Sequence, residues 1–370
     1  MPSPTAPILV ARRLDTWLVG WLAVAVWTAA LVVRTAHLSL GVDITSAVYW
    51  VGAVITAAHF GLSYHLAYGL GGDGVRARRT ALMTVPVVLA VVLVVIGAAS
   101  LASGRLTTRH VVTWSLTSVY VLTTWHYVKQ VYGIGRVGAA FAGVKLSRRE
   151  ADVLRYGLYP LAWLGGVVVL LRGANYSLSG YLVGIGFLPR EVLPVLRLLV
   201  TCGAIAIAVV FVQIRRRGRL PALLVAPYIA AFLWLALPVS PLLTVLLLAP
   251  LHALQYLAIG HRAEVAVARV HGERVSATWW LNIALAATCG GLLLSRWIPN
   301  LLDRWTGTPN QPLLFAALFF VGLNLHHYVI DATIWRSSGE LVRAVARRPV
   351  SAVDAAAAPS AVPVPAASPA

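Results

Sequence analysis

Charged residues are scarce in this sequence: they make up 11% of its 370 residues, whereas hydrophobic residues make up 59%. A soluble globular domain has about 25% charged and about 45–50% apolar residues. This shortage of charge excludes a soluble enzyme, a disordered regulator and a coiled coil. The mean hydropathy of +0.80 instead predicts an all-α integral membrane protein with several spans.

Acidic residues and cysteines are few as well. The chain has only 12 Asp and Glu, and a carboxylate-bridged di-iron bundle needs several glutamates on facing helices. The two cysteines, Cys202 and Cys289, both lie in apolar runs and are too few for a cysteine metal cluster. No Cys-x-x-Cys-His run is present, which excludes covalent haem attachment.

The net charge is +18, but no nucleic-acid-binding motif accompanies it. The basic residues lie in the loops that flank apolar runs, where they orient a membrane protein and contact anionic lipid. We therefore expect membrane lipid, and no nucleic acid, as a partner.

Ten segments are long and apolar enough to be spans of roughly 20 residues. They lie at about 16–33, 46–70, 81–102, 111–134, 156–172, 191–214, 221–238, 241–260, 277–295 and 313–335. With the N-terminus placed in the cytoplasm, Lys and Arg concentrate in the cytoplasmic segments, as the positive-inside rule requires. The sequence thus predicts about ten transmembrane helices of a multi-pass protein in the cell membrane, with both termini cytoplasmic.

These spans divide the chain into three parts. Residues 1–15 are predicted to be a cytoplasmic N-terminus, and 16–336 a polytopic helical membrane domain. Residues 337–370 form a cytoplasmic tail that is rich in Ala and Pro from Pro349 onward. Such a composition cannot build a core, so most of this tail is predicted to be disordered.

Histidines stand inside four of the predicted spans, the second, fourth, eighth and tenth. Polar side chains are costly inside a bilayer and usually face the interior of the helix bundle. The histidines of these spans are His59, His65, His126, His252, His326 and His327.

The depth of these histidines is matched. His126, His252 and His326 each precede an arginine by ten residues, and His59 precedes Gly69, the expected end of its helix, by ten. At 1.5 Å per residue, each lies about 15 Å above the cytoplasmic end of its helix. Because all four helices run in the same direction, one histidine from each is expected at one level near mid-membrane.

Neutral imidazole is the commonest metal ligand, so this level predicts a metal or haem site. The predicted ligands are His59, His126, His252 and either His326 or His327. His65 lies deeper and on another face of its helix; it joins a second metal cluster or contacts lipid headgroups. A histidine-rich site with at most one carboxylate suits iron, copper or zinc.

Other polar residues of these spans are candidates to orient ligands or transfer protons. They are Tyr127, Lys129, Gln255 and Asp331. A ligating histidine also needs a partner for its second nitrogen, and candidates lie one helical turn away. These are Ser63 for His59, Gln130 for His126, Tyr256 for His252 and Asp331 for His327.

Two short motifs carry a resemblance to known families. The His59-Phe60-Gly61 triplet is similar to the His-Phe-Gly of the bacterial Brp/Blh carotenoid-cleaving dioxygenases, polytopic proteins thought to hold iron through histidines in their spans. The His326-His327 pair more distantly resembles the histidine clusters of membrane desaturases and alkane hydroxylases. In those enzymes the histidines lie at the cytoplasmic edge, whereas here they lie deeper.

The first hypothesis is a membrane-embedded oxidoreductase with a histidine-ligated metal, most simply non-haem iron. Its substrate would be a lipophilic small molecule such as a lipid, a fatty-acyl chain or an isoprenoid polyene, and an electron donor is a possible further partner. Two alternatives stay open: a protein that binds haem b through histidine pairs, and a proton-coupled transporter with a relay of His, Lys and Asp. Copper is the other metal considered.

Overall fold

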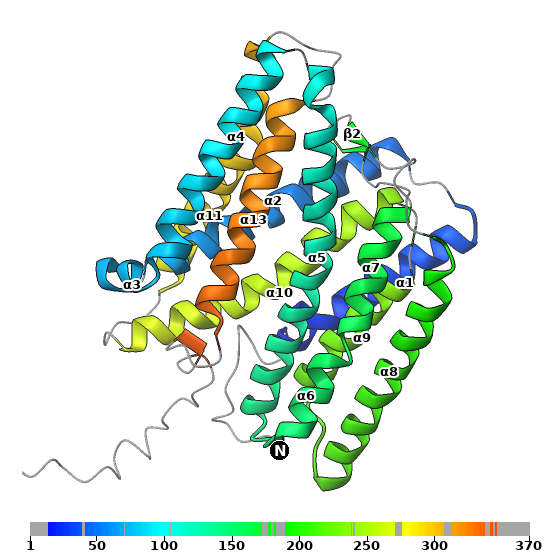
Figure 1. The fold of residues 1–370 in the computed structure, drawn as a ribbon. Helices are drawn as coiled ribbons and strands as arrows, with labels where there is room; N and C mark the ends of the chain where they lie inside the picture. Colours follow the sequence, from blue (N-terminus) through cyan, green and yellow to red (C-terminus); the bar gives the residue numbers. More distant parts are fainter. Residues whose placement is uncertain are drawn as a thin grey trace, which may run out of the picture.

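The computed structural model describes residues 14–345, except 39–40, 70, 104, 172–176, 179–180, 183–188, 238, 240, 271–275, 307–312, 337–340 and 343–344. Its described residues form helices almost throughout (Figure 1). The exception is an antiparallel pair of very short strands, β1 (Ser177–Leu178) and β2 (Tyr181–Leu182). The predicted all-α fold class is therefore confirmed, whereas most of the predicted disordered tail lies outside the described residues.

The helices follow one another along the chain with short connections. Those of the first half are η1 (Trp17–Trp21), α1 (Leu22–Thr35), α2 (Val42–Tyr68), α3 (Gly71–Ala77), η2 (Thr80–Thr84), α4 (Val85–Ala102), α5 (Arg105–Phe141), α6 (Arg148–Tyr156) and α7 (Tyr159–Leu171). Those of the second half are α8 (Val192–Arg217), α9 (Ala222–Ala236), α10 (Pro241–Val270), α11 (Ala277–Leu292), η4 (Leu293–Trp297), α12 (Ile298–Trp305) and α13 (Leu314–Ile334).

Six helical segments are long and apolar enough to cross a membrane, which indicates a multi-pass membrane protein. They are Trp17–Thr35, Ile44–Tyr68, Thr80–Ala102, Val192–Arg217, Ala277–Trp305 and Leu314–Ile334. The other four predicted spans coincide with α5, α7, α9 and α10, which do not meet the same standard of length and apolarity. Ten crossings and cytoplasmic termini therefore stay predictions.

The helices pack in two groups that share α5 and α10. In one group α2 lies against α10, α11 and α13, and α4 covers α13. In the other group α5 lies against α7 and α9, and α8 packs on the outside of α7 (Figure 1). The long helix α5 also contacts α13 and α10, so that α2, α5, α10 and α13 meet between the two groups.

Small residues let α2 and α11 approach closely. A Cβ atom added to Gly61 would overlap the backbone of Ala287, and one added to Gly291 would overlap the backbone of Ala57. Small residues at a helix interface allow this backbone contact, which strengthens packing where lipid provides no hydrophobic driving force. The two contacts also fix the antiparallel register of the pair, with Ala57 level with Gly291 and Gly61 level with Ala287.

Candidate metal centre

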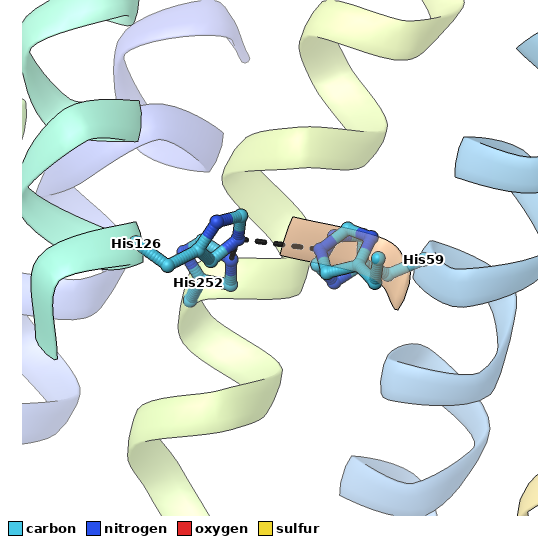
Figure 2. A group of neighbouring side chains, drawn as sticks. His59, His126 and His252 are labelled. Carbon is cyan, nitrogen blue, oxygen red and sulfur yellow. Dashed lines mark hydrogen bonds between the residues drawn. The ribbon is translucent and has the colours of Figure 1, made fainter. Parts of the chain in front are cut away.

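The four helices that meet between the two groups each contribute one buried histidine. These are His59 on α2, His126 on α5, His252 on α10 and His327 on α13. One ring nitrogen of each lies within 4.8 Å of the corresponding nitrogens of the other three. Figure 2 shows the rings of His59, His126 and His252 pointing toward one another from separate helices. The matched depth predicted from sequence is thus matched by convergence in space.

The nitrogens of three of these rings are in direct contact. Nε2 of His126 lies 3.1 Å from Nε2 of His252 and 3.2 Å from Nε2 of His327. A neutral imidazole nitrogen either carries one hydrogen or offers one lone pair, so it cannot donate to one neighbour and accept from another. Hydrogen bonds between the three rings therefore cannot satisfy all three Nε2 atoms.

A bound cation satisfies all of them. Nitrogens that each lie about 2.0–2.1 Å from one metal ion are about 3.0–3.4 Å apart at octahedral or tetrahedral angles. The two Nε2 distances around His126 fall in this range. In addition, Nε2 of His59 and Nδ1 of His252 are buried and have no hydrogen-bond partner among the described residues. The donor set therefore fits a metal ion better than it fits a hydrogen-bonded histidine network.

Ser63 holds one of the rings in the orientation that a ligand needs. Its Oγ lies 2.9 Å from Nδ1 of His327, and both residues are buried. When Nδ1 donates its hydrogen to Ser63, the lone pair of Nε2 points toward the other histidines. Ser63 had been predicted as a partner of His59 on its own helix, but the contact is made across to α13.

A carboxylate lies beside the four histidines. Oδ2 of Asp331 is 3.6 Å from Nε2 of His327 and 3.7 Å from Nε2 of His126. Its other oxygen accepts a 3.1 Å hydrogen bond from the hydroxyl of Tyr256, which in turn accepts one from the indole of Trp335 at 3.3 Å. Asp331 is thus placed to balance the charge of a cation held by the histidines.

Two of the six histidines predicted as metal ligands lie outside this cluster. Nε2 of His65 forms a 3.1 Å contact with the carboxylate of Glu264, and the His65 side chain is 41% exposed. The ring of His326 is bonded through Nδ1 to the hydroxyl of Tyr64 at 2.8 Å and through Nε2 to the carbonyl of Ala81 at 3.3 Å. The sequence left His326 and His327 as alternatives, and the structure places His327 in the cluster.

The other predicted site residues differ in their distance from the cluster. The buried ring of Tyr127 lies 4.2 Å from that of His252, measured between centroids. The amide of Gln255 is fully buried, donates to the carbonyl of Val19 at 2.7 Å and accepts from Gln130 at 3.2 Å. Gln255 therefore ties α10 to the N-terminal helix. Lys129 is exposed.

Sequence reasoning missed Glu264 as a partner of His65. The eighth span was predicted to end near residue 260, but α10 continues to Val270 and carries Glu264 alongside α2. It also missed the hydrogen bond between Tyr256 and Asp331, because the two residues lie on different helices. Spacing along one helix gives no information on such contacts.

No family model, curated protein or solved structure matches this chain. The assignment of a function therefore depends on the geometry of the histidine cluster and on the membrane character of the helices.

Proposed function

We propose that this protein is a membrane-embedded, metal-dependent oxidoreductase that acts on a lipophilic substrate. The observation that carries the proposal is the contact of three Nε2 atoms, from His126, His252 and His327, which hydrogen bonds cannot satisfy together. With His59 they supply four imidazole ligands, a set that suits iron, copper or zinc. Non-haem iron is proposed because of the similarity of the His59-Phe60-Gly61 triplet to that of the Brp/Blh dioxygenases.

Iron bound to these histidines would supply oxidation of the substrate with dioxygen as the oxidant, and an external electron donor where only one oxygen atom enters the product. The residues of the chain have the supporting roles. Ser63 orients His327, and the carboxylate of Asp331 holds negative charge near the cation. Tyr256, bonded to that carboxylate, keeps it in place. Burial of the whole group excludes water.

Haem b fits this arrangement less well. A porphyrin bound between two axial histidines fills the plane between them and keeps other side chains away from the iron. Here four rings from four helices crowd together, with 4.5 Å between the centroids of His59 and His327 and 4.8 Å between those of His126 and His327. The cluster matches a bare ion.

The test is the metal content and absorption spectrum of the full chain purified in detergent. We expect about one iron per chain and no Soret band, and we expect the metal to be lost in the double variant His126→Ala/His252→Ala. A Soret band would favour haem. The absence of metal under every loading condition would overturn the proposal and favour a transporter with a histidine relay.

A further inference from the structure

A cavity of about 500 Å³ lies between α2 and α11, next to the histidine cluster. Its size is within the range of about 300–1,000 Å³ of sites that hold one small molecule. Most of its lining is apolar and small, including Ala286 and Gly290 of α11 and Leu323 of α13. Both α2 and α11 are apolar enough to cross a membrane, so the cavity lies among lipid-facing helices.

Phe60 separates the cavity from the histidines. Its side chain lines the cavity, and its ring stacks on that of His59 with centroids 5.6 Å apart and nearly parallel planes. The same ring meets His327 edge-on at 5.1 Å. A molecule in the cavity is therefore one aromatic ring away from the cluster.

The cavity is polar at one end only. Because Gly61 packs on Ala287, one further turn along the antiparallel pair brings His65 of α2 level with the region of Asn282 of α11, and both residues line the cavity. They lie near the end of α2 and the start of α11, at one edge of the candidate spans. Asn282 stands inside such a span, where a polar side chain usually has a functional reason.

The chemistry of this polar end favours an uncharged group. The carboxylate of Glu264 already faces His65 at 3.1 Å and balances any positive charge on the imidazole, so no net positive charge is left to attract an acid. The amide of Asn282 both donates and accepts hydrogen bonds. A hydroxyl group, which also does both, complements it.

We infer that this cavity binds a single-chain amphiphile with a hydroxyl end, such as a long-chain alcohol, with the hydroxyl at His65 and Asn282 and the chain directed along α11 toward Phe60. The inference deepens the proposed function, since this molecule would be the substrate of the histidine cluster. Binding itself needs no metal, so the two proposals can fail separately.

Gly290 allows a direct test. A Cβ atom added to it meets nothing within 4 Å, so Gly290→Leu fills the cavity without a clash in the helix pair. Gly133 on α5 is also helical and equally open, but it does not line the cavity, so Gly133→Leu is the matched control. The probe is a long-chain alcohol that carries a photoreactive diazirine, and the labelled peptides of the purified full chain are identified by mass spectrometry.

We expect labelling of α2 and α11 peptides, competed by unlabelled alcohol, to fall by about tenfold or more in Gly290→Leu and to be unchanged in Gly133→Leu. A second variant, Asn282→Leu, should remove the preference for the alcohol over the alkane of equal length. Equal labelling of wild type and Gly290→Leu, or labelling spread over all lipid-facing helices, would overturn the inference. Metal content is measured on the same samples, and we expect it to be the same in all of them.

Discussion

Two regions of this molecule are equally helical but have very different interiors. Around α7, α8 and α9 the buried side chains are almost all apolar, with Leu158 and Leu161 fully buried at the centre. Where α2, α5, α10 and α13 meet, the buried positions instead hold four histidines and the carboxylate of Asp331. Burying polar groups costs free energy that an apolar core does not incur. The comparison separates a region that stabilises the fold from a region whose cost indicates a function.

The largest difference is expected between two neighbouring histidines. His327 contacts His126 within the cluster, whereas His326 is bonded to Tyr64 and the backbone. We therefore expect His327→Ala to abolish metal binding and His326→Ala to keep it. Metal content of the two purified variants, measured side by side, checks this.

His326→Ala is the matched control for this experiment, because it removes the same side chain from the next position of the same helix. Equal loss of metal in both variants would mean that the effect comes from damage to α13. Equal retention in both would exclude His327 as a ligand.

The next effect is on stability and belongs to the apolar region. Leu161 is fully buried, and Leu161→Ala should lower the free energy of unfolding by about 2–5 kcal/mol because it leaves a cavity. Leu198 on α8 is 64% exposed, so Leu198→Ala is the control and should have little effect. Thermal unfolding in detergent measures both variants. If the two regions are as distinct as the structure indicates, Leu161→Ala that remains folded keeps its full metal content.

A smaller effect is expected from the side chain that orients a ligand. Ser63→Ala removes the hydroxyl 2.9 Å from Nδ1 of His327, and loss of such a partner weakens metal affinity by about 10–100-fold. Competition with a metal chelator measures the affinity. Ser115→Ala on α5 is the control, since that exposed hydroxyl bonds only to the carbonyl of Val111 in its own helix. Equal affinity of Ser63→Ala and wild type would remove the positioning role from Ser63.

The sequence was sufficient to predict the helical fold, the helices that carry the site and the level at which their histidines meet. Depth follows from counting residues along a helix, since the rise per residue is constant. Rotation about the helix axis does not, because it is set by packing between helices. This is why His326 and His327 could not be told apart, and why Ser63 was paired with His59 on its own helix although it contacts His327 on α13.

The smallest effect is expected at the edge of the apolar region, where Glu150 begins α6. Its carboxylate accepts from the backbone N–H of Ser147 at 2.8 Å and forms an ion pair with Arg217 of α8. Burial raises the pKa of Glu150, but the hydrogen bonds from Ser147 and the charge of Arg217 lower it further, so that the pKa lies below its ordinary value of 4.5. The stability from this group is therefore complete above pH 4.5 and lost as the pH falls through the lower pKa of the folded state.

Glu150→Gln tests this without removing the side chain. Arg217 is half-exposed, so solvent screens the pair and we expect a loss of about 1 kcal/mol or less near neutral pH. As the pH falls well below 4.5, the wild-type carboxylate takes up a proton, and its midpoint of thermal unfolding should approach that of the variant. A gap of the same size at every pH would show that the loss comes from the altered hydrogen bonds of the α6 cap. Because Glu150 lies far along the chain from all four histidines, metal content should be equal in both proteins, which keeps the two regions separate in this experiment too.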